Sequence, residues 1–585
     1  MLNRNALITI LILIAGCILF IPFLGAVHLF DWDEINFAEC AREMITTGNY
    51  SQVQINYQPF WEKPPLFIWM QAISMNMFGV NEFAARFPNA ICGIISLVVI
   101  YNIGKKVYDE KFGLIWVLVY AGSFLTFFYF KTGIIDPWFN LFIFLGIYNV
   151  ILFTNNPEGK NNFKYLFFAG SSIGLSVLTK GPVGLLIFGL TSAVFLITKR
   201  FHNIGKLKHL LVFIASFCFI GLSWFIIEIL KGNSKLVFEF VNYQIRLLNT
   251  KDSGHGGFLL YHFVILLIGC FPSSVFFFTS FKKSNSDTPF QLHFKKWMFI
   301  LFWVVLILFT IVKTKIVHYS SMCWLPLTFL SAHGIYKIII GEKQLKKWQF
   351  NLGIFLVLIF GITLTLLPLI DHIKGPLLNG NMIQDKFALE NLKANGNWLG
   401  FEWIFGFLFL FSTVLFFYRI LKGHFKAITH LFISSLITIF LASIFIVPKI
   451  EFYVQGAAIE FYKKIRNEDC FVETASFKSY AYLFYSDKKP EQNTPELLKF
   501  AKEIGDKEAK EGIYDPMQSF ARYSVIYICD NKITKPAYIV LKCNNETEFM
   551  SRYPEFKKLY SKNGFVFLIK KPYPTVNSNE FKTGI

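Results

Sequence analysis

Long apolar segments with almost no charge constrain the fold of this chain more than any other feature. Many of them run for about 18 residues or more, the length that a helix needs to cross the hydrocarbon core of a bilayer. Of the 585 residues only 16% are charged, whereas soluble domains usually carry about 25%. This composition excludes a soluble enzyme, a secreted disulfide scaffold and a disordered chain. We expect an α-helical polytopic membrane protein.

The apolar segments predict thirteen membrane spans. They lie near residues 6–26, 85–104, 113–130, 138–154, 163–179, 182–198, 209–230, 258–280, 297–312, 320–340, 351–370, 402–418 and 427–448. The first segment has no obvious small-residue cleavage site, so we expect a retained span rather than a signal peptide. Lys and Arg are densest in alternate short loops, beginning with Arg4. The positive-inside rule then places the N-terminus in the cytoplasm and the residues after the last span outside.

The formal charge of +19 could suggest nucleic-acid binding. Most of the excess, however, lies in short loops between apolar segments, where orientation in the membrane explains it better than phosphate binding. The 9 cysteines are spread without CxxC pairs, so neither a zinc site nor a disulfide framework is indicated. We therefore expect membrane lipids, and no nucleic acid, among the partners.

The domain organisation follows from the spans and from a change of composition after them. Residues 1–449 form the predicted membrane domain, with long outside loops at 27–84 and 231–257. In the first loop, residues 34–47 have the pattern of an interfacial amphipathic helix, and a second helix should begin at Pro65. Residues 450–572 predict a small extracytoplasmic α/β domain, followed by a polar tail at 573–585. The β-like runs are 470–473, 524–529, 537–542 and 565–570, and the helical stretches are 494–504 and 546–553.

Unusual polar residues gather on the outer side of the predicted topology. They are Asp31, Asp33, Glu34, Glu62, Lys63, Asp136, Lys180, Arg246, His255, Lys313, Lys315 and His318. Each one alone has a structural explanation, such as an acidic first helical turn or an interfacial anchor. Together they suit a substrate with a phosphate head and a lipid tail. Fixed cations would stabilise a leaving phosphate, and a carboxylate would accept a proton from the nucleophile.

Several short motifs occur in a characteristic order. They are Asp33-Glu34 with Ala38-Glu39 and Arg42-Glu43, Phe60-Trp61-Glu62-Lys63-Pro64-Pro65-Leu66, Asn81-Glu82-Phe83-Ala84-Ala85-Arg86-Phe87-Pro88, Asp136-Pro137 and Leu178-Thr179-Lys180-Gly181-Pro182. In these motifs the chain resembles the GT-C type of membrane glycosyltransferases that use polyprenyl-phosphate sugars. The resemblance is to the bacterial aminoarabinose transferases of lipid A and the related protein mannosyltransferases. No GxGxxG motif or P-loop indicates a nucleotide donor.

The resemblance implies roles for individual residues. Asp33 takes the position of the catalytic carboxylate, Glu34 supports it, and Asp136 is a second acidic residue of the cavity. Lys63 takes the position of the cation that holds the donor phosphate, with Arg246 and Lys315 as helpers. Glu62 and His255 are the candidate ligands of a possible divalent metal, although two residues alone make a poor metal site. Asn36 departs from the pattern, because relatives often have Arg there.

The function implied by the resemblance is transfer of a sugar from polyprenyl (undecaprenyl) phosphate to a lipid A-like lipid, another envelope lipid or a protein. The reaction would be an inverting displacement on the periplasmic face of a bacterial inner membrane. A phosphate acceptor would need only orientation by Asp33, whereas a hydroxyl acceptor would need a base. The alternative function is a transporter or flippase of lipid-linked sugars, and a docking module on a membrane anchor is a third. Span interiors with few charges and no internal repeat favour the enzyme over the transporter.

Overall fold

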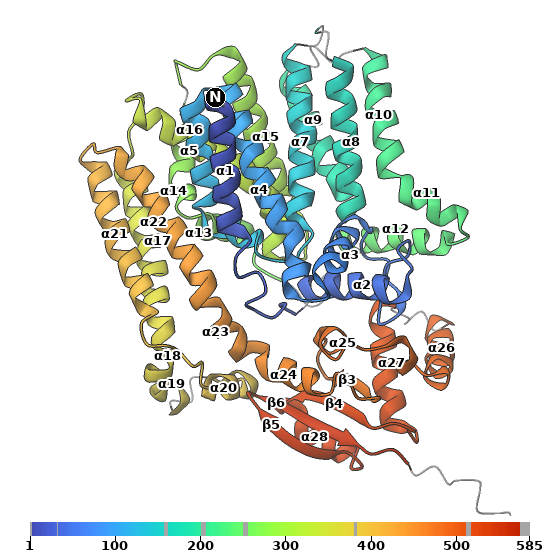
Figure 1. Cartoon of the computed structure of the whole chain (residues 1–585). Helices are drawn as coiled ribbons and strands as arrows, with labels where there is room; N and C mark the ends of the chain where they lie inside the picture. The colour runs from blue at the N-terminus through green and yellow to red at the C-terminus, as the bar shows by residue number, and fades with distance from the viewer. Residues whose placement is uncertain are drawn as a thin grey trace, which may run out of the picture.

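The long helices stand side by side in one part of the molecule, and the C-terminal strands lie beyond the end of that bundle at which α2, α3 and α12 run (Figure 1). The first residues of α1 lie at the opposite end (Figure 1). The computed structural model describes residues 3–31, 33–156, 159, 162–200, 206–249, 256–282, 284–379, 383–510 and 516–573. The fold and the site below are those of these residues.

The bundle is made of the apolar helices. The first half contains α1 (Arg4–Phe20), α4 (Glu82–Val107), α5 (Glu110–Ala121), α6 (Phe124–Tyr129), α7 (Asp136–Asn155), α8 (Asn162–Lys180), α9 (Val183–Thr198), α10 (Leu207–Gly221) and α11 (Ser223–Leu230). The second half contains α13 (Tyr261–Gly269), α14 (Ser273–Phe277), η2 (Phe278–Phe281), α15 (Pro289–Ile311), η3 (Val317–Cys323), α16 (Trp324–Ile339), α17 (Lys347–Leu366), α21 (Trp403–Leu421) and α22 (Lys426–Phe445). Every one of the predicted apolar segments is therefore helical.

The number of membrane crossings is a separate matter from helicity. By length and composition, six of the described helices could cross a membrane, or up to eight if each bent pair is one span. The pair α10 and α11 is bent by 51°, and α13 is bent by 108° from the segment that follows it. The fold is thus that of a multi-span helical membrane protein, while the count of thirteen spans stays a prediction.

Small residues allow close helix packing near the site. A Cβ atom at Gly170 of α8 would collide with the Ser216 hydroxyl and the Phe213 carbonyl of α10. One turn along α8, Gly174 lies against Gly221, and a Cβ atom at Gly174 would lie only 2.8 Å from the Gly221 backbone nitrogen. Since apolar helices in lipid gain little from hydrophobic burial against one another, close backbone approach is a main source of their association. This packing fixes the end of α8, where Lys180 lies.

Helices α2 (Asp33–Thr47), α3 (Leu66–Phe78) and α12 (Ser234–Asn249) run across the end of the bundle (Figure 1). The helices predicted for 34–47 and from Pro65 are confirmed, and a short hairpin of β1 (Gln54–Ile55) and β2 (Gln58–Pro59) separates them. Every residue from Glu34 to Met44 is buried. Helix α2 therefore has no free polar face of the kind expected for an interfacial helix, because the C-terminal region covers it.

The C-terminal region contains a sheet of order β3-β4-β6-β5, in which β3 and β4 are parallel and the other pairs are antiparallel. The strands are β3 (Phe471–Ala475), β4 (Ala537–Lys542), β5 (Lys557–Lys562) and β6 (Phe565–Lys570). The helical elements between α22 and the chain's last described residues are α23 (Val447–Glu451), η5 (Phe452–Gly456), α24 (Ala457–Lys464), α25 (Ala481–Tyr485), η6 (Pro490–Gln492), α26 (Pro495–Lys510), α27 (Pro516–Asp530), η7 (Cys543–Asn545) and α28 (Glu546–Arg552). Before α21 lie η4 (Leu367–Leu369), α18 (Ile370–Ile373), α19 (Gly375–Asn379) and α20 (Lys386–Lys393).

One predicted strand of this region is wrong. Residues 524–529 belong to helix α27, although Val525, Ile526 and Tyr527 have high strand propensity. Ser524 and Ile528 are buried, at the spacing of one helical turn, so tertiary burial of one helix face outweighs local propensity. The polar strand β5 was not predicted, because an edge strand with mostly exposed side chains lacks the apolar pattern.

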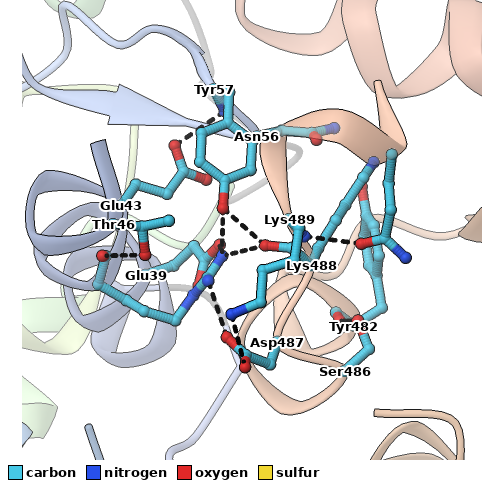
Figure 2. A network of polar contacts seen from close by, with 12 residues as sticks. Glu39, Glu43, Thr46, Asn56, Tyr57, Tyr482, Ser486, Asp487, Lys488 and Lys489 are labelled. Carbon is cyan, nitrogen blue, oxygen red and sulfur yellow. Dashed lines mark hydrogen bonds and ion pairs between the residues drawn. The ribbon is translucent and has the colours of Figure 1, made fainter. Parts of the chain in front are cut away.

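A buried polar network joins α2 to the C-terminal region, and Figure 2 shows Glu39, Tyr57 and Asp487 gathered in it. The guanidinium of Arg42 donates from Nε and Nη2 to both carboxylate oxygens of Glu39, at 2.7 and 2.6 Å. It also donates to Asp487 Oδ1 at 3.0 Å and to the carbonyl of Lys488 at 2.9 Å. The Tyr57 hydroxyl donates to the same carbonyl at 2.6 Å. Helix α2 and the C-terminal region therefore share one core.

Glu43 is a second buried carboxyl in this network. One of its oxygens accepts a hydrogen bond from the backbone N–H of Tyr57 at 2.8 Å, and the other has no hydrogen-bond partner among the described residues. Burial and the neighbouring Glu39 raise the pKa of the Glu43 carboxyl well above its usual range, against the opposing charge of Arg42. At a pH between the ordinary pKa of a glutamate and this raised pKa, Glu43 is protonated in the folded protein and ionised in the unfolded chain.

We expect Glu43→Gln to stabilise the protein increasingly as the pH rises. A group whose pKa is raised on folding contributes stability below its ordinary pKa, and this contribution is lost as the pH rises toward the folded-state value. The glutamine amide cannot ionise. The free energy of unfolding of the variant should therefore exceed that of wild type by a further amount of about 1.4 kcal/mol for each pH unit, from pH 5 up to the raised pKa of Glu43. Thermal unfolding in detergent from pH 5 to 8 measures it. The exposed Glu491→Gln is the matched control, and a difference that does not grow with pH would contradict the protonated state.

Candidate functional site

A cavity of about 1020 Å³ lies where α2, α7, α8, α9, α12 and η3 meet the C-terminal region. Its polar part is lined by Asp33, Glu62, Lys63, Asp136, Lys180 and His318, together with Lys478 and Tyr480. Its apolar part is lined by side chains such as Val183, Leu186 and Ile187 of α9, Phe225 of α11 and Phe309 of α15. The cavity can therefore hold a ligand with a charged end and a long apolar end.

Asp33 is the first residue of α2 and lies at the polar part of the cavity. Its Oδ2 atom is 3.1 Å from Nε2 of His318, and 41% of its side chain is exposed. Partial burial alone would raise the pKa of this carboxyl. The contact and charge of His318, with the charges of Lys63 and Lys180, outweigh burial and hold the pKa of Asp33 well below its usual range. Asp33 is therefore ionised at neutral pH.

Glu34 is placed differently from its neighbour. Its carboxylate accepts two hydrogen bonds from Arg86, at 2.7 and 2.8 Å, and both side chains are buried. It also accepts from the backbone N–H groups of Phe30 at 2.8 Å and Gly133 at 2.6 Å. These four bonds fix the start of α2 against α4 and the segment before α7. The buried Glu34 carboxylate therefore holds the helix start at which Asp33 lies.

Asp136 begins α7 and is buried beside the cavity. Its Oδ1 atom accepts a hydrogen bond from the ammonium of Lys180 at 2.6 Å. The segment before it is held by Asn89, whose amide donates to the carbonyls of Thr132 at 2.7 Å and Ile134 at 2.6 Å. A buried charge needs a partner of this kind. The Asp136–Lys180 pair therefore places one cation and one carboxylate in the cavity wall at fixed positions.

Lys63 and Arg246 approach the same aromatic ring. The Lys63 ammonium lies 5.5 Å from the centroid of Tyr243, and the Arg246 guanidinium carbon lies 5.4 Å from it. Lys63 also lies 3.8 Å from the carboxylate of Glu62. Two residues predicted to bind the donor phosphate are thus brought together from distant parts of the sequence, at the edge of the cavity that α12 covers.

Lys315 does not join this cluster. Its ammonium donates to the carbonyls of Phe309, Thr310 and Val312 at 2.9, 2.7 and 2.6 Å. All of its three N–H donors are therefore used at the C-terminal end of α15, and the side chain is not part of the cavity lining. The geometry gives Lys315 the role of a helix C-cap rather than the phosphate-binding role expected from the sequence.

The predicted metal site has no support among the described residues. His255 lies outside the residues that the structure describes. Within the described ranges, no three His, Cys, Asp or Glu side chains lie close enough together to hold a metal ion. The carboxylate of Glu62 faces a cation instead. The divalent metal therefore stays a prediction.

Three residues of the polar part had no role assigned from the sequence. In the sequence, His318 is one of many polar residues on the outer side, and neither Lys478 nor Tyr480 belongs to a recognisable motif. The backbone N–H of Tyr480 donates to Asp31 Oδ1 at 3.0 Å, which ties the loop after β3 to the segment before α2. No local pattern predicts this contact, because 449 residues separate the two partners. Only the packing of the C-terminal region on α2 creates it.

Known proteins share both sequence and fold with this chain. The sequence profile of the dolichyl-phosphate-mannose-protein mannosyltransferase family matches residues 62–224. The undecaprenyl phosphate-alpha-4-amino-4-deoxy-L-arabinose arabinosyl transferase of Wigglesworthia glossinidia brevipalpis is 26% identical over 329 residues, which cover 54% of this chain and 56% of that protein. Enzyme 1 of that name from Proteus mirabilis is 26% identical over 317 residues, covering 53% and 56%. The chain thus matches little more than half the length of these relatives.

The fold is shared over a longer range than the sequence. The crystal structure of ArnT from Cupriavidus metallidurans bound to undecaprenyl phosphate superposes with a TM-score of 0.73, covering 98% of this chain and 100% of that one at 14% identity. At this identity the superposition establishes a common fold. The family profile begins after Asp33 and Glu34, and its range includes Lys63, Asp136 and Lys180. In sequence and in fold, this chain is similar to the ArnT proteins.

Proposed function

We propose that this protein transfers a sugar from a polyprenyl-phosphate donor to an envelope lipid, at the outer face of a bacterial inner membrane. The observation that carries the proposal is the composition of the cavity, which combines carboxylates and fixed cations with a long apolar wall. The relatives named for undecaprenyl phosphate and a sugar support the same donor class. A lipid A-like acceptor is the acceptor class that the resemblance of the sequence motifs implies.

The donor would bind with its phosphate near Lys63 and Arg246 and its prenyl chain along the apolar wall of α9, α12 and α15. The acceptor oxygen would attack the anomeric carbon from the opposite side, so the sugar is transferred with inversion. Cations fixed before the reaction stabilise the charge that develops on the departing phosphate, at no cost of reorganisation. Lys63, Arg246 and the Asp136–Lys180 pair supply such fixed charges in this chain.

A transporter of lipid-linked sugars is the weaker alternative. A transporter would expose its polar site to both sides in turn, near the bilayer midplane. Here the charged residues of the cavity lie at the end of the bundle that α2 and the C-terminal region cover. This placement suits chemistry at one surface of the membrane.

Mass spectrometry of envelope glycolipids and glycoproteins tests the proposed function. The strains are one that lacks the protein, one complemented with the wild-type chain, and the parent. We expect one sugar-mass difference on a lipid, which is lost without the protein and restored by the wild-type chain. Unchanged glycans with lipid-linked sugar accumulating on one leaflet would instead support the transporter.

We expect Lys63→Ala to weaken use of the donor much more than the chemical step. A hydrogen bond to a charged group is worth about 1.5–3 kcal/mol, so the KM for donor should rise about 10–100-fold. The measurement is the rate of sugar transfer against donor concentration in lipid vesicles. Lys231→Ala is the control, since Lys231 is exposed at the end of α11 and lies outside the cavity lining. An unchanged donor dependence would remove Lys63 from the phosphate site.

A further inference from the structure

His318 and Asp33 form a carboxylate–imidazole pair in the wall of the cavity. His318 lies on η3, between α15 and α16, and Asp33 begins α2, so 285 residues separate them in the sequence. Nε2 of His318 lies 3.1 Å from Asp33 Oδ2, and 15% of the imidazole side chain is exposed. Both residues line the same cavity. The tertiary fold alone brings the two groups together.

The carboxylate determines which ring nitrogen of His318 can act as a base. An ionised carboxylate only accepts hydrogen bonds, so a neutral imidazole must present its N–H to Asp33 from Nε2. The lone pair then lies on Nδ1. Among the described residues Nδ1 has no hydrogen-bond partner, and it is not one of the enclosed unpaired nitrogens. Nδ1 is therefore accessible to a bound molecule.

Asp33 by itself is poorly suited to accept a proton. With a neutral imidazole, the hydrogen bond of His318 and the charges of Lys63 and Lys180 still lower the pKa of its carboxyl, and a base is most effective when its pKa is near the working pH. Histidine is the side chain that most often serves as a general base. Lys63 from the segment before α3 and Lys180 from α8 act on Asp33. The other charged residues that line the cavity are Asp31, Glu34, Glu62, Asp136 and Lys478. Tyr319 and Tyr480 also line this part of the cavity.

We propose that His318 is the general base of the transfer, that Asp33 orients it, and that the acceptor is therefore a hydroxyl group. The inference rests on the proposed function. The acceptor O–H proton moves to Nδ1 of His318 as the oxygen lone pair forms a bond to the anomeric carbon. The bond from that carbon to the donor phosphate oxygen breaks, and its electron pair leaves with polyprenyl phosphate. The imidazolium formed beside Asp33 then releases its proton to water.

The experiment compares wild type, His318→Gln and the exposed His372→Gln in vesicles made from the total envelope lipid of a strain that lacks the protein. Such vesicles supply both donor and acceptor, and the initial rate of glycolipid formation is followed by mass spectrometry from pH 5.5 to 8.5. We expect His318→Gln to lower kcat about 10²–10⁴-fold with a nearly unchanged KM for donor. Any fall of the wild-type rate toward acidic pH that protonation of the imidazole causes should be absent from the residual rate of the variant. His372→Gln should match wild type.

Two further measurements separate catalysis from a structural effect. Added imidazole should restore activity to His318→Ala, because a soluble base can enter the space that the ring leaves, and it should not change the wild-type rate. The glycolipid product should resist mild acid, which cleaves glycosyl phosphates but not ordinary glycosides. Wild-type turnover by His318→Gln, an unchanged acidic limb in that variant, no rescue by imidazole or an acid-labile product would each overturn the inference while leaving the proposed function intact. Absence of sugar transfer by wild type would overturn both.

Discussion

Asp33→Asn is expected to lower kcat for sugar transfer by about 10²–10⁴-fold, the usual contribution of acid–base catalysis, while the protein stays folded and inserted. The amide removes the charge that faces His318 Nε2 at 3.1 Å. An amide can also donate to the imidazole, which would favour the wrong tautomer of the ring. Because 41% of the Asp33 side chain is exposed, we expect a change in the free energy of unfolding of no more than about 1 kcal/mol.

The measurement is the initial rate of glycolipid formation in vesicles, with elution from size-exclusion chromatography as the check on folding. Asp385→Asn is the matched control. Asp385 is exposed and caps α20 through a hydrogen bond from the Phe387 N–H, a role that Asn fulfils equally well. Turnover by Asp33→Asn at the rate of this control would remove Asp33 from the mechanism.

Arg42→Ala is expected to lower the free energy of unfolding by about 3–5 kcal/mol, the cost of breaking a buried ion pair by removing one partner. The guanidinium is 2% exposed and forms the contacts to Glu39, Asp487 and the Lys488 carbonyl described above. Its loss leaves the buried Glu39 carboxylate beside Glu43 without its cation. The C-terminal region should therefore be released from α2, and with it Tyr480 from the cavity.

Thermal unfolding in detergent at one scan rate measures the loss, and limited proteolysis reports release of the C-terminal region. Arg466→Ala is a closely matched control. Arg466 lies 3.7 Å from the same Asp487, but 53% of its side chain is exposed, and exposed ion pairs contribute about 0–1 kcal/mol. An unfolding temperature for Arg42→Ala that is no lower than that of Arg466→Ala would contradict a stabilising network.

The candidate site could be predicted in part because its first motifs are local. Asp33 and Glu34 follow one apolar segment, Lys63 precedes a helix marked by prolines, and Asp136 begins another helix with Pro137 at the next position. Short stretches of sequence determine where a helix starts and how long an apolar segment is. Both the helices and the end of the bundle that carries the charges could therefore be inferred. Residue chemistry then indicated a phosphate and a lipid tail.

The pairing of the charged side chains in the site depends on segments that are far apart in the sequence. Lys180 pairs with Asp136, Arg86 with Glu34, and His318 with Asp33, each across at least 44 residues. Lys315 illustrates the same limit, because its charge resembles that of Lys63 while its ammonium is used by the end of α15. Sequence pattern reports which side chains are unusual, but not which of them face one another.

The sequence by itself determined a multi-span helical membrane protein with an acidic and basic site at one end, because transfer of apolar segments into lipid depends on composition alone. The tertiary structure decided that α2 is enclosed by the C-terminal region, and that residues 524–529 form a helix rather than a strand. It also decided that His318 faces Asp33. These features depend on burial and on partners contributed by distant segments, which local propensity cannot specify.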